Sequence, residues 1–74
     1  MDNRDIQKKI SGMVQKTTWS MLWQKKEISV SDIVKKGYKE SSVRMALFNF
    51  VKNGWAEKPN GTRNIYIVSK DVEK

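Results

Sequence analysis

The stretch ESSVRMALFNFVKNG, residues 40–54, shows the strongest periodicity in this 74-residue chain. Its apolar residues recur at the spacing i, i+3, i+4, i+7 and i+8, which places them on one face of a helix. They are Val43, Ala46, Leu47, Phe50 and Val51. The Asn53-Gly54 pair that follows favours a helix end, because glycine adopts the left-handed conformation without strain. The pattern predicts a helix over residues 40–53 with one face in the core.

Just before this helix, the sequence predicts a short strand followed by a short helix. The run Glu27-Ile28-Ser29-Val30-Ser31 alternates between polar and apolar residues, which is typical of a strand. The hydroxyl of Ser31 is a candidate cap for a helix over residues 32–36, with Asp32 favourable in its first turn. Gly37 supplies a left-handed stop. We expect Ile33 and Val34 to join the core.

The first third of the chain, about residues 3–25, contains no proline and a single glycine, Gly12. Apolar residues recur there at helical spacing. They include Ile6, Ile10, Met13, Val14, Met21 and Leu22. We expect a helix capped by Asn3 or Asp5. Because glycine costs about 1 kcal/mol relative to alanine inside a helix, two shorter helices remain an alternative.

Two tryptophans lie four residues apart in this segment, at Trp19 and Trp23. We expect at least one of them to pack inward, where its indole N–H needs a hydrogen-bond partner. At the other end of the chain, residues 55–58 and 63–68 read as two strands, and Ile65 is a candidate core residue. The segment Pro59-Asn60-Gly61-Thr62 joins them, which predicts a hairpin with a basic tip.

Length and composition narrow the class of function. The chain is short enough to form one domain over residues 1–74, with residues 1–10 as a helical extension and residues 70–74 as a loose tail. It lacks cysteine and histidine, which removes thiolate nucleophiles, the usual zinc ligands and the commonest general base. Its eight acidic residues form no close pair in the sequence. We therefore expect a binding module and not an enzyme, with no cofactor and no metal site.

The charge of the chain points to a polyanionic partner. Fifteen Lys and Arg residues against eight acidic residues give a net charge of +7. A potential of that sign attracts nucleic acid or an anionic membrane surface. The first residues do not resemble a signal peptide, and no apolar stretch approaches the roughly 18 residues that span a bilayer. We therefore expect a cytoplasmic protein, at the nucleoid or in the host cytoplasm if it is viral, with no membrane partner.

The order helix, short strand, helix, tight turn, helix and hairpin resembles the winged helix-turn-helix family. Three local matches carry the resemblance. Ile28-Ser29-Val30-Ser31-Asp32-Ile33 looks like the start of the family's second helix. Ser42-Val43-Arg44-Met45-Ala46-Leu47, followed by Phe50-Val51-Lys52-Asn53-Gly54, looks like its recognition helix, and residues 61–67 look like its wing. The resemblance implies a mainly helical α+β fold of three helices with a two- or three-stranded antiparallel wing.

The resemblance also implies a function, double-stranded DNA binding by a small transcriptional regulator or accessory factor. The third helix would enter the major groove and the wing would reach the adjacent backbone or minor groove. The helix would present Lys39, Ser41, Ser42, Arg44, Met45, Phe48, Asn49 and Lys52, and the wing would present Lys58, Asn60, Thr62, Arg63 and Asn64. Arg44 suits a guanine edge, Asn49 an adenine, the two serines phosphates, and Arg63 a narrow minor groove. Lys35 and Lys36 would hold the DNA backbone.

Alternatives remain open on the same residues. Met45 and Phe48 are unusual on a DNA-facing helix, so they contact either thymine methyl groups or an acidic protein partner. Ile6, Ile10 and Met13 either cover the core or form the seam of a homodimer.

A minor alternative is a domain that binds left-handed Z-DNA, because residues 43–48 and 61–66 are similar to the recognition helix and wing of that family. The similarity fails at four positions. That family has asparagine in place of Arg44, tyrosine in place of Phe48, and prolines in place of Arg63 and Asn64.

Overall fold

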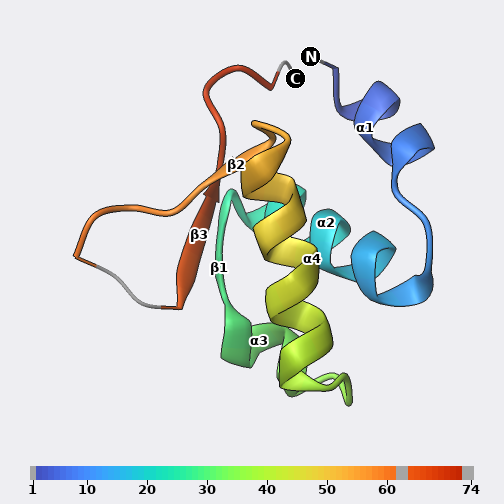
Figure 1. The fold of residues 1–74 in the computed structure, drawn as a ribbon, viewed down its shortest axis with the longest axis vertical. Coiled ribbons are helices and arrows are strands. Elements are labelled where there is room, and N and C mark those ends of the chain that lie inside the picture. The colour runs from blue at the N-terminus through green and yellow to red at the C-terminus, as the bar shows by residue number, and fades with distance from the viewer. Residues whose placement is uncertain (1, 62–63, 73–74) are drawn as a thin grey trace.

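Two helices, and not one, form the first third of the protein in the computed structural model, which describes residues 2–61 and 64–72 (Figure 1). Helix α1 spans Asn3–Lys9 and helix α2 spans Met13–Lys25. Between them the backbone at Ile10 is extended, and Gly12 has φ +85°, a conformation that glycine adopts at little cost. The alternative of two short helices is therefore confirmed. Asp2 caps α1 by accepting from the amide of Arg4, so the prediction of Asn3 or Asp5 as the cap is wrong.

Strand β1 spans Glu27–Ser29 and leads directly into helix α3, Val30–Val34. Ser29, and not Ser31, is the N-cap. Its hydroxyl accepts from the amide of Asp32, and its own amide donates to the Asp32 carboxylate at 3.1 Å. This reciprocal capping box requires a side-chain acceptor, such as a carboxylate, three positions after the cap. Ser29 meets that requirement, because it is followed at the right spacing by Asp32.

Helix α4 spans Glu40–Lys52 and ends within one residue of the predicted bound. Val43, Ala46, Leu47 and Phe50 are buried, as the periodicity predicts. Val51 is 36% exposed, so its assignment to the core is wrong. The helix packs against α2, α3 and the sheet, and Val51 lies at the edge of the face that these elements cover.

Strands β2, Ala56–Glu57, and β3, Ile65–Val68, form the predicted hairpin and are shorter than expected. The sheet is antiparallel with the order β1-β3-β2. Ile28 is paired with Tyr66, and Glu57 with Ile67, so β3 lies in the centre. The expected α+β class is confirmed, but the described residues contain four helices where three were expected.

An aromatic cluster at one end of α4 closes the core. Trp19 is 1% exposed, and its ring meets that of Phe50 edge to face with centroids 5.4 Å apart. Trp23 stacks on Trp19 with ring centroids 6.2 Å apart, and Trp55 meets Trp19 edge to face at 6.4 Å. The indole N–H of Trp19 donates to the side-chain oxygen of Asn3 at 2.6 Å. The expectation that at least one of the first two tryptophans packs inward is confirmed.

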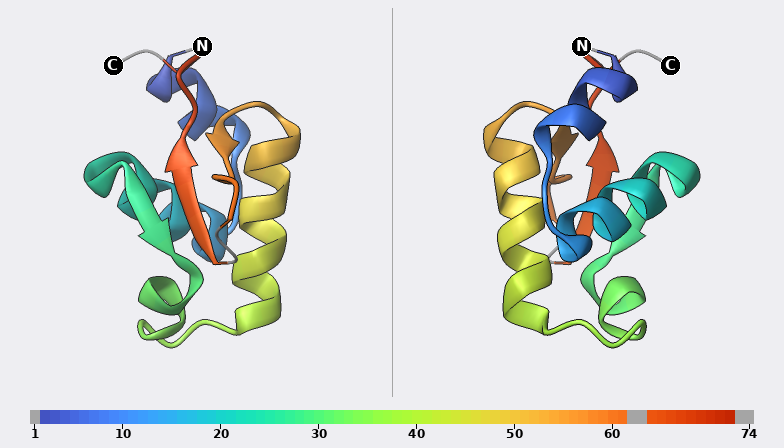
Figure 2. Two further views of the ribbon diagram at one scale, coloured as in Figure 1. Left: turned by 90° about the vertical axis from the view of Figure 1, so that its left-hand side faces the viewer. Right: turned by 90° about the vertical axis from the view of Figure 1, so that its right-hand side faces the viewer.

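Helix α1 and the segment after β3 both contribute residues to this core (Figure 2). Ile6 and Ile10 are buried within the same chain, at 0% and 6% exposed. These two residues therefore cover the core, which is the first of the two alternatives, and a homodimer through the first helix stays a prediction. Met13 remains 70% exposed. Near the other terminus Val72 is 7% exposed, so the expected loose tail is packed on the core at that residue, and residues 73 and 74 lie outside the described residues.

Candidate functional site

The outward face of α4 is an exposed helical surface beside the hairpin. Because Val43, Ala46, Leu47 and Phe50 face inward, the residues spaced i, i+4, i+7 and i+11 along the opposite side face solvent. This outward stripe consists of Ser41, Met45, Phe48 and Lys52, all of them exposed. Met45 and Phe48 are 62% and 60% exposed. The centre of the predicted recognition surface is therefore apolar and open.

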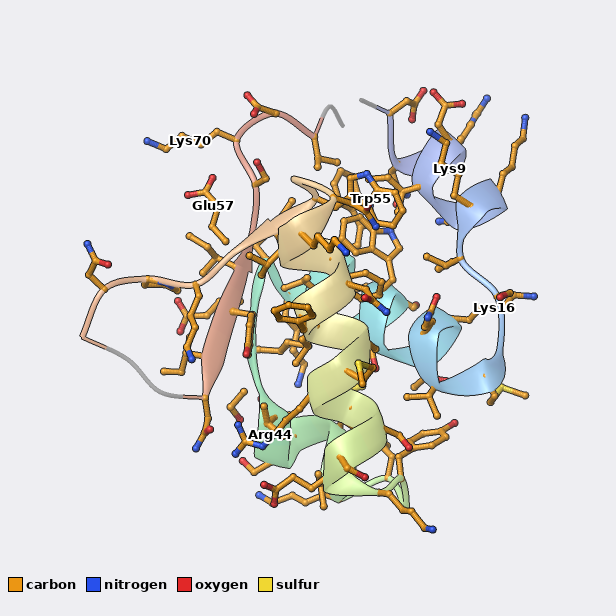
Figure 3. The ribbon with its side chains drawn as sticks, in the orientation of Figure 1. Lys9, Lys16, Arg44, Trp55, Glu57 and Lys70 are labelled. Carbon is orange, nitrogen blue, oxygen red and sulfur yellow. The ribbon has the colours of Figure 1, made fainter. Side chains whose placement is uncertain are left out.

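Arg44 lies beside this stripe and connects α4 to the hairpin (Figure 3). Its Nε donates to the Glu40 carboxylate at 2.8 Å, one turn earlier on the same helix. One Nη2 N–H donates to the side-chain oxygen of Asn64 at 2.9 Å, just before β3. These bonds hold the guanidinium between the helix and the hairpin and leave its Nη1 side without a partner among the described residues.

Three exposed lysines surround the turn between α3 and α4. Lys35 and Lys36 follow α3 directly, and Lys39 is the N-cap residue of α4 with no side-chain cap. Ser41 and Ser42 are exposed in the first turn of α4. The first amides of a helix lack intrahelical acceptors, so this end combines free N–H groups with positive charge.

The hairpin loop, residues 58–64, contributes the third part of the candidate surface. Lys58, Asn60 and Asn64 are exposed. The ammonium group of Lys58 lies 5.8 Å from the centroid of the Tyr66 ring. Thr62 and Arg63, predicted as wing contacts, lie outside the described residues.

Asn49 is the predicted contact that the structure places least favourably. It is half-buried and occurs seven residues after Ser42, on the flank of α4 that faces α2 and not on the outward stripe. On this flank a groove of about 470 Å³ separates the first turns of α4 from the start of α2. Ser42 and Met45 line it from α4, Met13 lines it from the first turn of α2, and Ser11 lines it from the segment before α2.

Sequence reasoning missed Glu40 as a member of the site. Its spacing of four residues from Arg44 is a recognisable signal for an ion pair on a helix. The contact between Arg44 and Asn64 carried no such signal, because the two residues are 20 positions apart in the chain.

The chain matches no protein-family model, no curated protein and no solved structure. Interpretation of the surface rests on its own chemistry. Over the residues that the structure describes, no three acidic residues gather in a way that could hold a metal ion. Within the same residues no helix has the length and apolar character needed to cross a bilayer.

Asp32, in the first turn of α3 beside the candidate surface, has a pKa below its ordinary value. The main cause is the hydrogen bond from the Ser29 amide to its carboxylate, and the Ser29 side chain acts in the same direction. Nearby Lys25 and Lys35 also favour the charged form. This carboxylate serves the cap of α3. Apart from the Glu40 carboxylate, which is paired with Arg44, the surface offers a partner cations, hydroxyls, amides and two apolar side chains.

Proposed function

We propose that this protein is a winged helix-turn-helix protein that binds double-stranded DNA. Helix α4 enters the major groove and the loop of residues 58–64 acts as the wing. The protein then serves as a small transcriptional regulator or an accessory DNA-binding factor. The observation that carries the proposal is the position of Arg44, which lies on the exposed side of α4 and is bonded to Asn64 at the base of the loop. A helix and a hairpin loop thereby share one surface.

The order of the elements supports this interpretation. After α1 the order is α2, β1, α3, α4, β2 and β3, and β1 pairs with the β3 strand of the hairpin. The major groove of B-DNA is wide enough for one helix, about 12 Å. The outward stripe of α4 meets the base edges in this arrangement, and the lysines of the α3–α4 turn meet phosphates.

The charges around α4 favour phosphate contacts. Six exposed cations of the described chain lie on α4, on the turn before it or on the loop beside it. They are Lys35, Lys36, Lys39, Arg44, Lys52 and Lys58. Each neutralised phosphate contributes about 0.9 to the slope of log affinity against log salt, so five or six contacts predict a slope of about −5.

Fluorescence anisotropy with a labelled random-sequence duplex tests the proposal. The titration is made at low and moderate salt and is repeated with single-stranded DNA and with RNA. We expect binding that prefers duplex DNA and weakens steeply with salt. Absence of duplex binding at low salt contradicts the proposal.

Two lysine variants separate a specific surface from the general effect of net charge. Lys36→Ala removes one charge beside α4, and Lys9→Ala removes one charge from α1, at the far end of the molecule from Arg44 (Figure 3). We expect Lys36→Ala to weaken duplex binding and to reduce the salt slope by about 1. Lys9→Ala should leave both nearly unchanged, and equal effects of the two variants contradict the proposed surface.

The exposed apolar pair favours a second function, a protein-interaction or inhibitor module on the same scaffold. Met45 and Phe48 lie side by side on α4, one turn apart, with Lys52 next to them. Such a patch suits an acidic protein with an apolar anchor. Under this alternative the chain binds no duplex at low salt. Under the DNA-binding proposal Phe48→Ala changes duplex affinity only modestly, while Lys36→Ala has the larger salt-dependent effect.

A further inference from the structure

The chemistry of the outward stripe is unusual for a helix that faces DNA. Its two ends are polar, Ser41 and Lys52, but its centre is formed by Met45 and Phe48. Both side chains are more than half exposed, and they are among the few large apolar residues that the fold leaves in solvent. The core is complete without them, since Val43, Ala46, Leu47 and Phe50 fill the inner face of the helix.

An apolar side chain gains free energy on binding only where it meets an apolar group of the partner. Along the floor of the major groove most base edges present hydrogen-bond donors and acceptors. The C5-methyl group of thymine is the apolar feature there. A helix that places Met45 and Phe48 against the base edges is therefore complementary to thymine methyl groups.

We propose that Met45 and Phe48 form a methyl-recognition site that makes the protein select duplexes with thymines at defined positions of the major groove. The inference rests on the proposed DNA-binding function and specifies which class of duplex the protein selects. Arg44 lies next to Met45 in sequence and one turn from Phe48, with its Nη1 side free of described partners. The preferred site then combines methyl-bearing thymines with a neighbouring guanine.

Charge complementarity favours DNA over a protein as the occupant of this face. The apolar pair lies within a frame of cations, with Lys39 before it, Lys52 after it and Arg44 at its side. The nearest acidic group on the helix, Glu40, is paired with Arg44 at 2.8 Å. An apolar patch with cations at both ends of the helix and on one side fits base edges that lie next to phosphates.

Replacement of thymine by deoxyuridine tests the site directly. Deoxyuridine lacks only the C5-methyl group and keeps every hydrogen-bonding group of the base. The probe is the tightest-binding duplex of about 20 base pairs that the wild-type protein selects from a random pool, and each thymine is replaced in turn. We expect one or two replacements to weaken binding about four-fold each, the effect of one buried methyl-sized group, and the others to have no effect.

Protein variants assign these replacements to side chains. Phe48→Ala or Met45→Ala should weaken binding of the thymine duplex. At the position that each residue contacts, replacement of thymine by deoxyuridine should then cause no further loss of affinity, a loss that we call the deoxyuridine penalty. Phe48→Leu, which keeps an apolar side chain, should retain part of the penalty. Val51→Ala is the matched control, because Val51 is an exposed apolar residue of the same helix outside the stripe. Circular dichroism verifies that each variant is folded.

The outcomes separate this inference from the function on which it depends. Salt-sensitive duplex binding that no deoxyuridine replacement weakens overturns the methyl-recognition site and leaves DNA binding in place. The site is also overturned if Phe48→Ala and Met45→Ala both retain the full penalty, and the pair is then assigned to a protein partner. Absence of duplex binding at low salt overturns both proposals.

Discussion

Substitution of Arg44 by alanine separates DNA readout from the stability of the fold. In the folded protein two of the five guanidinium N–H groups are used, one by Glu40 and one by Asn64. Both bonds are exposed. An exposed ion pair of this spacing contributes about 0.3–0.5 kcal/mol, and the bond to Asn64 about 0.5–1.5 kcal/mol. The expected loss of unfolding free energy is therefore about 1–2 kcal/mol.

A domain of this length has a total stability of about 4–11 kcal/mol, so the Arg44→Ala variant remains folded. Loss of a bidentate guanine contact costs about 1–3 kcal/mol of discrimination, which corresponds to roughly a 5- to 150-fold loss in the affinity ratio. The assay is the ratio of affinities for the selected duplex and for a shuffled duplex of the same composition, measured at one salt concentration. An unchanged ratio in a folded Arg44→Ala variant would falsify the assignment of Arg44 to base readout.

The matched control for this experiment is Lys58→Ala on the hairpin loop. Lys58 is exposed and lies near Tyr66, outside the outward stripe of α4. A phosphate contact weakens all duplexes about equally when it is lost, so both affinities should fall while their ratio stays constant. If Lys58→Ala changes the ratio as much as Arg44→Ala does, the loop takes part in sequence readout. The assignment of Arg44 to base readout and Lys58 to a phosphate contact is then refuted.

Three further predictions concern the fold that positions this surface. Ile6→Ala should lower the unfolding free energy by about 2–5 kcal/mol at any protein concentration, because Ile6 is buried within its own chain. The exposed control, Met13→Ala, should change the unfolding free energy little. An unfolding midpoint that depends on protein concentration contradicts the intramolecular packing of Ile6. Asn3→Ala leaves the partly buried indole N–H of Trp19 without its acceptor and should cost about 1–3 kcal/mol in thermal or denaturant unfolding; an unchanged midpoint contradicts the docking of α1 through this bond. Because the pKa of Asp32 is lower in the folded protein than in the unfolded chain, its carboxylate stabilises the fold at pH values above the ordinary carboxyl pKa. This stability is lost as the pH falls through the lowered pKa of the folded protein. Asp32→Asn should therefore flatten the acid limb of a stability curve, and parallel curves for variant and wild type refute this role.

The sequence alone determined those features that depend on neighbouring residues. The periodicity of residues 43–50 located α4 and its inner face, since side chains three and four positions apart share one side of a helix. A single glycine at position 12 marked the break between α1 and α2 as an alternative, because glycine is unfavourable inside a helix. The net charge of +7 and the absence of histidine and cysteine followed from composition. DNA binding and the contact residues drawn from the family resemblance stay predictions.

The tertiary structure decided what depends on distant parts of the chain. Ser29 and Ser31 are both plausible caps by type, and the pairing of β1 with β3 keeps the backbone extended as far as Ser29, so that α3 begins directly after it. The contact of Arg44 with Asn64 exists because the sheet returns the chain to the side of α4. Ile6 faces the core and not a second protomer, because α1 folds back on the Trp19 cluster. Periodicity identifies which face of a helix is apolar, but long-range packing determines which surface covers that face and which remains open to a partner.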